Sequence, residues 1–223
     1  MKKYQDRKDK VVFPVTSSYK LDGVFAVVKN GRFCSKNDNE FAAVSDCLAG
    51  HGFEDGVEGE LYRPLMLFED IISAVKRDEP NDLTPHIGFY PHRAIYKVES
   101  NSHEELDAAM ELAVAAGYEG IVITTQGGEM LKYKPFFDEE YIITDAVEGK
   151  GKFTGLLGKF ICHGIHDNSK TFGVPMNGDY AYLGRLWEDR CTFIGAWVTV
   201  RYQNKTKNGI PRFPRGTSIR DYE

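Results

Sequence analysis

The chain has 223 residues, of which 42% are hydrophobic, and its formal net charge at pH 7 is -5. This length is enough to bury a core in one large domain or two small ones. The acidic balance argues against indiscriminate binding to nucleic acid, although a local basic cluster can still bind it. No apolar run reaches the ~18 residues of a membrane span, and the charged N-terminus does not resemble a signal peptide. We therefore expect a cytoplasmic protein, bacterial or in a host cell if viral, with no membrane partner.

The four cysteines, at positions 34, 47, 162 and 191, lie far apart and form no Cys-x-x-Cys pair. This spacing predicts neither a zinc site nor a disulfide framework. His163 and His166 follow Cys162 closely, but without a second pair of ligands we interpret them as strand-end and loop residues.

A lysine, a carboxylate and a glycine come shortly before the first predicted strand. Lys20, Asp22 and Gly23 are followed by the apolar run 24–28, which is typical of a buried strand. A neutral lysine amine at the mouth of a strand can act as a nucleophile. On its own, the pattern is more typical of an ordinary turn or strand rim than of a nucleophile.

Helices and strands alternate up to residue 137. Helical spacing covers residues 40–48, 66–77 and 102–116. The last helix is the clearest, since Ser102 and Glu105 suit a capping box, Gly117 suits a C-terminal stop, and one face is apolar (Leu106, Ala109, Met110, Ala113). The predicted strands are 24–28, 57–62, 87–90, 94–98, 120–124 and 130–133.

From residue 138 onward, short β-rich segments are separated by turns that contain glycine. These segments are 141–147, 157–163, 170–174 and 193–202. About 85 residues of this kind suit a five-stranded oligonucleotide-binding (OB) barrel. We therefore predict a mixed α and β chain with two domains, 1–137 and 138–223.

Charged residues recur at three later strands. Glu58 and Glu60 flank a glycine in one strand, Glu119 precedes the next, and Lys132 and Lys134 lie two residues apart on the last. Two lysines at this spacing share one face of a strand and need anions opposite them. A nucleoside triphosphate satisfies that need.

Together, these segments resemble the ATP-dependent polynucleotide ligases of the covalent nucleotidyltransferase superfamily. Residues 20–23 are similar to the family's nucleophile motif, and residues 58–60 to the strand whose last glutamate holds the ribose. Residues 119–123 resemble its metal-associated motif and residues 131–134 its phosphate-binding motif. The Ser-Lys-Asn segment at 35–37 resembles one that grips the 5′ phosphate at a nick.

The C-terminal part resembles the barrel of small DNA ligases through residues 148–152, 155–158, 200–203, 211–215 and 219–221. The resemblance implies an α+β fold in which a nucleotidyltransferase (adenylation) domain with mixed and antiparallel sheets, 1–137, precedes an OB-fold DNA-binding domain, 138–223. RNA ligases and capping enzymes share the first set of motifs but usually differ in the barrel.

The implied activity is the sealing of nicks in duplex DNA in three steps. Lys20 attacks the α-phosphate of ATP, the adenylate moves to the 5′ phosphate, and the 3′ hydroxyl displaces AMP. Lys132 and Lys134 would neutralise phosphates and disfavour protonation of Lys20. Magnesium, or manganese, is expected near Glu119 and Asp22.

The resemblance also assigns roles residue by residue. The implied catalytic residues are Lys20, Asp22, Lys132 and Lys134. The implied ATP contacts are Tyr19, Lys20, Glu60, His92, Glu119, Lys132, Lys134, Arg215 and Arg220. The implied DNA contacts are Lys36, Lys150, Lys152, Arg201, Lys205, Lys207 and Arg212. Between residues 200 and 220 no acidic residue interrupts the basic ones, which predicts a basic stripe that binds DNA phosphates. The resemblance further implies a monomer whose partners are ATP and nicked double-stranded DNA.

Some positions depart from the family pattern. Phe25 stands where an arginine is common, and Gly216 where a large apolar residue is common. His92 aligns with the aromatic residue that stacks on adenine, and Phe89 and Tyr90 remain alternatives. No additional DNA-binding domain is recognisable, so we expect a minimal ligase core.

Two alternative functions remain. An RNA ligase or a capping-type guanylyltransferase would use the same lysine chemistry. A non-catalytic nucleic-acid-binding protein built on a barrel would leave Lys20, Lys132 and Lys134 without a role.

Overall fold

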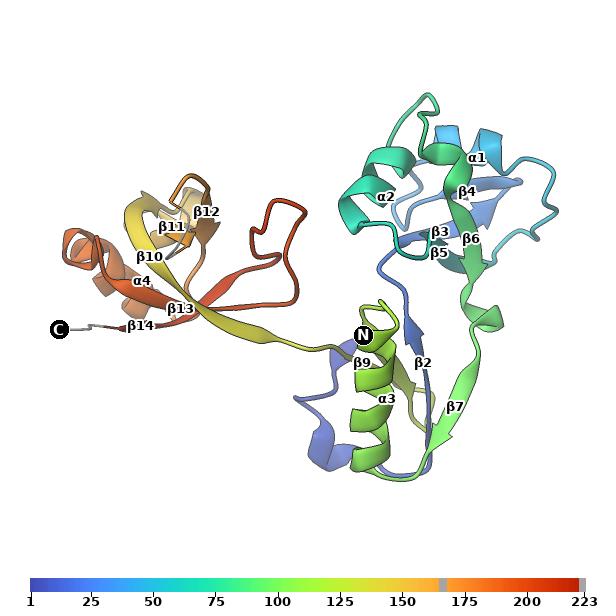
Figure 1. The fold of residues 1–223 in the computed structure, drawn as a ribbon, viewed down its shortest axis with the longest axis horizontal. Coiled ribbons are helices and arrows are strands. Elements are labelled where there is room, and N and C mark those ends of the chain that lie inside the picture. Colours follow the sequence, from blue (N-terminus) through green and yellow to red (C-terminus); the bar gives the residue numbers. More distant parts are fainter. Residues whose placement is uncertain (165–167, 221–223) are drawn as a thin grey trace. The chain divides into compact units, whose positions relative to one another are not determined.

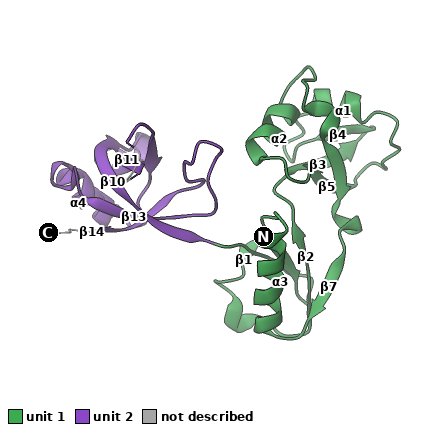
Figure 2. Ribbon diagram, in the orientation of Figure 1, with its two compact units in different colours: residues 1–135 green, residues 136–223 purple. Residues whose placement is uncertain are grey.

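The structure, a computed structural model, describes residues 1–164 and 168–220. His166 and Asp221 therefore lie outside the described residues. The chain divides into two compact units, Met1–Pro135 and Phe136–Glu223 (Figure 2). The units combine strands and helices, which confirms the predicted α+β class (Figure 1). Within the described part of the chain, no helix is long and apolar enough to cross a membrane.

The first unit contains two sheets, and the larger one has five strands in the order β1-β9-β8-β2-β7. Its strands are β1 (Lys2–Lys3), β2 (Val15–Lys20), β7 (Lys97–Ser100), β8 (Gly120–Thr124) and β9 (Met130–Tyr133). All neighbours pair antiparallel except β1, which runs parallel to β9. The helix α3 (His103–Ala115) packs on this sheet and buries Leu106 and Ala113 against Ile121, Ile123 and Leu131 (Figure 1).

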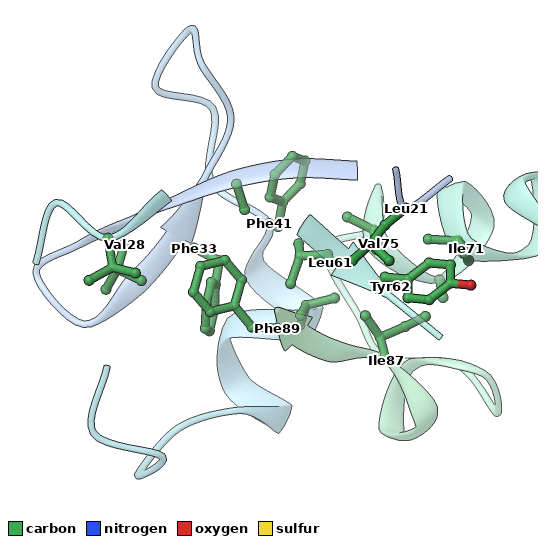
Figure 3. Packing of buried hydrophobic residues seen from close by; sticks show 14 residues of the cluster. Leu21, Val28, Phe33, Phe41, Leu61, Tyr62, Ile71, Val75, Ile87 and Phe89 are labelled. Carbon is green, nitrogen blue, oxygen red and sulfur yellow. The ribbon is translucent and has the colours of Figure 1, made fainter. Parts of the chain in front are cut away.

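The second sheet of this unit has four strands in the order β4-β3-β5-β6. They are β3 (Val24–Lys29), β4 (Arg32–Cys34), β5 (Glu58–Tyr62) and β6 (Gly88–Pro91). The helices α1 (Ala42–Cys47) and α2 (Phe68–Val75) contribute to its core, which Figure 3 shows at close range. Phe33 and Phe89 pack together there, with ring centroids 4.8 Å apart. Three short 3-10 helices complete the unit: η1 (Lys8–Lys10), η2 (Thr84–His86) and η3 (His92–Ala94).

Both ends of α3 follow the sequence prediction closely. The hydroxyl of Ser102 accepts a hydrogen bond from the Glu105 N–H, and the Glu105 carboxylate accepts one from the Asn101 N–H at 2.7 Å. At the other end, Gly117 has φ +85°, and the Tyr118 N–H donates to the Ala113 carbonyl at 2.9 Å. This is the Schellman arrangement, which ends the helix and turns the chain into β8.

The second unit is a five-stranded antiparallel sheet in the order β12-β11-β10-β13-β14. Its strands are β10 (Phe137–Glu148), β11 (Leu157–Gly164), β12 (Thr171–Val174), β13 (Trp197–Tyr202) and β14 (Arg215–Arg220), with α4 (Tyr180–Glu188), η4 (Gly151–Phe153) and η5 (Arg190–Phe193) between them. A parallel bridge joins Met176, just after β12, to Gly216 in β14. Two backbone hydrogen bonds support this bridge, from the Gly216 N–H to Pro175 and from the Asn177 N–H to Gly216, and they close the sheet into a barrel.

Gly216 has a specific packing role in this closure. A Cβ atom at this position would lie 2.2 Å from the Met176 sulfur and 3.3 Å from Cγ1 of Val174. A large apolar side chain at position 216 therefore does not fit this barrel, because Met176 already fills the space. The departure from the family pattern is thus compensated by a neighbouring side chain.

Several element predictions were incomplete. The strands β1, β2, β4 and β14 and the helix α4 were not predicted. The strand predicted at 94–98 begins only at Lys97, because η3 occupies His92–Ala94, and the strand predicted at 193–202 begins at Trp197, after η5. Cys34, Cys47, Cys162 and Cys191 are free, and Cys34 and Cys162 are buried.

Candidate active site

The segment around Lys20 joins the two sheets of the first unit. Lys20 is the last residue of β2, and β3 of the other sheet begins at Val24. Between them, Leu21 is only 7% exposed and is part of the core of the four-stranded sheet. A Cβ atom on Gly23 would lie 2.8 Å from the Leu61 carbonyl oxygen, so only glycine allows this close crossing.

Lys20, Glu119 and Lys134 form a cluster at this junction. The Lys20 Nζ lies 2.5 Å from Oε2 of Glu119, and the Lys134 ammonium pairs with the other oxygen, Oε1. Their side chains are 17%, 12% and 12% exposed, respectively. Burial alone would raise the pKa of Glu119, but the two lysines outweigh it and hold this pKa below its ordinary value.

Strand register brings these three residues together. Lys20 is opposite Gly120 on β8, and the Glu119 N–H donates to the Lys20 carbonyl at 2.9 Å. Gly120 has φ +143°, and a Cβ atom there would lie 2.3 Å from the Tyr133 carbonyl oxygen. The glycine thus allows the backbone of β8 to approach the end of β9, where Lys134 follows.

Lys132 adds a third positive charge nearby. Leu131 points into the core. Lys132 and Lys134, one and three residues later, therefore point to the face of the chain that lies away from this core. The pKa of Lys134 is lowered from its ordinary value, first by burial and further by Lys20 and Lys132, although Glu119 opposes the shift. Two ammonium groups pair with one carboxylate and a third acts on Lys134, so the cluster has an excess of positive charge that attracts a further anion.

A second group of predicted residues lies on the four-stranded sheet. Phe25, Glu60 and Tyr90 are direct cross-strand neighbours on β3, β5 and β6. The His92 Nε2 lies 3.5 Å from Oε1 of Glu60, and the His92 and Phe25 ring centroids are 6.0 Å apart. Phe89 is 8% exposed within the core, so it is not available as a stacking surface. Of the three candidates, this leaves His92 and Tyr90.

Tyr19 and Asp22 flank Lys20 in the sequence but have different surroundings. The Tyr19 ring stacks on Tyr118, with centroids 4.3 Å apart and planes 11° apart. Asp22 lies close enough to Tyr62 to contribute to that residue's raised pKa, of which burial is the main cause. The contact with Tyr118 was not predicted from the sequence.

The carboxylates of Glu119 and Asp22 are the donors that this site offers to a divalent metal. Among residues 1–164 and 168–220, no three His, Cys, Asp or Glu side chains gather as a metal-binding group. Mg²⁺ commonly takes only one or two protein carboxylates and completes its shell with water and phosphate oxygens. The donor set fits an ion of that kind, provided that Glu119 exchanges one of its two ammonium contacts for the metal.

The basic residues of the second unit have acidic neighbours that the sequence order did not suggest. Arg201 makes two hydrogen bonds to Asp138, Lys205 lies 2.7 Å from Glu139, and Arg220 lies 3.1 Å from Glu140. These acids occupy consecutive positions on β10, which pairs with β13. The predicted stripe is therefore partly neutralised.

The other basic residues of the second unit that were predicted to contact DNA or ATP lie on loops, on η4 and on β14. Lys150 precedes η4, Lys152 lies over the Phe153 ring at 5.2 Å, and Arg212 lies over the Phe213 ring at 5.5 Å. Lys207 lines a groove of about 620 Å³ together with Lys205, and Arg215 is exposed on β14. The contacts of all these residues with DNA or ATP remain predictions.

Comparison with known proteins identifies the fold. Residues 148–220 match the DNA ligase OB-like domain. One similar solved structure is a Lig E DNA ligase, described as binding DNA with a minimal scaffold. It is 21% identical to this chain with a TM-score of 0.80, and the match covers 99% of this chain and 98% of that chain. The solved structure named Pmar-Lig_Pre is 18% identical with a TM-score of 0.78, and the match covers 100% of this chain and 67% of that chain.

No curated protein sequence matches the chain. The described structure nevertheless has the fold of minimal DNA ligases, with a ligase-type OB domain at its C-terminal end. The resemblance inferred from the sequence motifs is confirmed at this level.

Proposed function

We propose that this chain is an ATP-dependent DNA ligase that joins a 5′ phosphate to a 3′ hydroxyl at a nick in duplex DNA. The observation that carries the proposal is the Lys20–Glu119–Lys134 cluster. It holds a buried amine at the end of a strand, within an excess of positive charge that suits a triphosphate.

In the first step, the neutral Lys20 amine attacks the α-phosphorus of ATP. A P–N bond forms as the bond to the pyrophosphate oxygen breaks, and the Glu119 carboxylate, 2.5 Å from Nζ, is placed to take the amine proton. Lys132 and Lys134 stabilise the charge that collects on the leaving pyrophosphate. Bound Mg²⁺ would add charge neutralisation at the phosphate oxygens.

The nucleoside would be held by the four-stranded sheet. Glu60 is 18% exposed and can accept hydrogen bonds from the ribose hydroxyls. His92, at 44% exposed, has a ring available for stacking on adenine, and Tyr90 at 37% is the alternative. Tyr19 and, from the second unit, Arg215 and Arg220 are proposed as further ATP contacts.

In the second step, a 5′ phosphate oxygen attacks the lysyl adenylate, so that the P–N bond breaks and a phosphoanhydride forms. In the third step, the 3′ hydroxyl attacks the 5′ phosphorus and AMP leaves. Asp22 is proposed to act in this joining chemistry. The proposed duplex contacts are Lys36, Lys150, Lys152, Arg201, Lys205, Lys207 and Arg212.

The OB-like match of residues 148–220 supports DNA over RNA as the substrate, because the matched domain is that of DNA ligases. The test is to incubate the chain with ATP or GTP labelled at the α-phosphate and to look for a covalent band on a denaturing gel. The labelled protein is then offered nicked DNA or nicked RNA. We expect label from ATP that transfers to nicked DNA. Label from GTP, or transfer only to RNA, would instead support the guanylyltransferase or RNA ligase alternative.

A further inference from the structure

A groove on the four-stranded sheet of the first unit combines basic side chains with an apolar surface. Its volume is about 580 Å³, and its lining includes Phe25 of β3, Lys36 of the loop after β4, and Lys76 and Arg77 after α2. These residues come from three separate parts of the chain, which the fold brings to one place. Lys76 and Arg77 had no role in the interpretation of the sequence.

The groove has more positive than negative charge. Lys36, Lys76 and Arg77 contribute three cations, while the acidic lining residues are Glu40 and Asp78. Glu40 is already paired with Arg32, whose guanidinium lies 2.6 Å from its carboxylate and also contacts Asp46. Within the described residues, the Lys36 and Lys76 ammonium groups make no hydrogen bond or ion pair, so they are available to an external anion.

Arg77 is held in position by its backbone and by one side of its guanidinium. Its Nε donates to the Ser73 carbonyl at 2.8 Å, and its own carbonyl accepts from the Ala43 N–H at 3.4 Å. The Nε contact leaves the two terminal nitrogens as donors for a ligand. An arginine fixed in this way loses little side-chain entropy when it binds a phosphate.

The groove is adjacent to the Glu60–His92 group. Phe25 lines the groove and is also the cross-strand neighbour of Glu60, and its ring lies next to His92. A ligand that occupies the groove therefore approaches the proposed nucleoside site along the surface of one sheet.

We propose that this groove binds the sugar–phosphate backbone of a DNA strand. Lys36, Lys76 and Arg77 contact phosphates, and the Phe25 ring packs against a deoxyribose. A sugar–phosphate strand carries negative phosphates separated by apolar sugars. It therefore matches a groove that combines cations with the Phe25 ring better than a free inorganic anion does. The identification of the strand as DNA rests on the proposed ligase function, whereas the assignment of Lys76 and Arg77 rests on the groove itself.

The experiment compares the unmodified chain with a Lys76→Ala/Arg77→Ala double variant in binding to fluorescent nicked duplex DNA, without ATP, over a series of salt concentrations. Each lost phosphate contact should lower the slope of log affinity against log salt by about 0.9, so we expect a decrease of about 1.8 and at least tenfold weaker binding at ~0.1 M salt. A Lys8→Ala/Lys10→Ala variant is the matched control, because it removes the same charge from η1. The control should retain the original slope.

Arg77→Ala removes the contact with Ser73, so Lys76→Ala alone is the second variant, for which a decrease of about 0.9 is expected. A normal slope in both groove variants, or an equal decrease in the Lys8/Lys10 control, would overturn the proposal. Equal competition by polyglutamate of the same charge would also overturn it, since the site would then recognise charge alone. Adenylation of the unmodified chain by ATP tests the ligase function separately. DNA binding that depends on the groove in a chain that takes no label from ATP would reject the ligase function and retain the groove.

Discussion

The Lys20 ammonium and the Glu119 carboxylate lie 2.5 Å apart, with the Glu119 N–H hydrogen-bonded to the Lys20 carbonyl. The two residues are thus linked through both backbone and side chain. Under the proposed function, this double link holds the nucleophilic nitrogen next to the carboxylate that takes its proton, so a shift of either residue would disturb both positioning and proton transfer.

The Lys20→Ala variant should take no label from ATP but should still seal a nick that already carries a 5′ adenylate. The amine is needed only to form the covalent intermediate, whereas the last step uses the hydroxyl of the DNA. Gel assays with labelled ATP and with pre-adenylated nicked DNA measure the two activities. Lys10→Ala, on η1, is the control and should behave like the unmodified chain. Covalent label on the Lys20→Ala protein would remove this residue from its role.

Glu119→Gln should lower the free energy of unfolding at pH 7 by about 2 kcal/mol, because it leaves two largely buried ammonium groups without their shared charged partner. The pKa of Glu119 is lowered in the folded chain, so its stabilising effect is complete above the unfolded pKa of about 4.3 and is lost as the pH falls through the lowered value. Urea unfolding of both proteins at pH 7 and at decreasing pH measures the difference. A difference that does not narrow in acid would contradict this account.

Lys134→Ala should reduce the rate of adenylation by at least about tenfold. A charge-assisted contact to a phosphate in a largely buried site typically contributes 1.5 to 3 kcal/mol or so. Single-turnover labelling with ATP measures the rate, and Lys8→Ala provides a remote lysine for comparison. An unchanged rate would show that Lys134 does not contact the triphosphate.

Glu139→Gln should strengthen binding to nicked duplex DNA by about threefold and make it more sensitive to salt. Lys205 is paired with Glu139, and the removal of this half-exposed carboxylate, which also accepts a hydrogen bond from the Tyr141 hydroxyl, frees the ammonium for phosphate at a gain of less than about 1 kcal/mol. Conversely, Lys205→Ala with Lys207→Ala should weaken binding and flatten the salt dependence. Anisotropy titrations over a salt series measure both effects, and Glu111→Gln on the exposed side of α3 is the control. Equal affinity in all four proteins would show that this surface does not contact DNA.

Gly216→Ala should destabilise the barrel by about 1 kcal/mol, because the added methyl group would lie 2.2 Å from the Met176 sulfur and must displace that flexible side chain. Combination with Met176→Ala should recover part of the loss, since the shortened side chain makes room for the methyl group. Thermal unfolding of the single and double variants measures this coupling. Additive losses would indicate that Met176 is not the obstacle.

Local signals in the sequence predicted α3, β8 and β9 well. The capping residues of α3 and the alternation of β8 and β9 are properties of short segments. In contrast, β2 contains Thr16, Ser17 and Ser18 and lacks a clear apolar alternation. The helix α4 does have helical apolar spacing, with Tyr182, Leu183, Leu186 and Trp187 on the core side, but it contains a glycine and lies within a segment otherwise rich in strands.

Contacts that depend on register between distant strands were not visible in the sequence. The motifs indicated that Lys20, Glu119 and Lys134 belong to one site, but the position of Glu119 between two lysines follows from the pairing of β2 and β8. In the same way, the pairing of β10 with β13 places Asp138 opposite Arg201. The groove at Lys76 and Arg77 depends on the packing of α2, which no local pattern reveals.

The candidate site draws on both sheets of the first unit. The lysines and Glu119 belong to the five-stranded sheet, whereas Glu60, Tyr90 and His92 belong to the four-stranded one. Under the proposed function, the residues that act on the phosphates and the residues that contact the nucleobase therefore belong to different sheets. If that function holds, substitutions at Tyr90 and His92 would change base preference while the residues that form the bond keep their own scaffold.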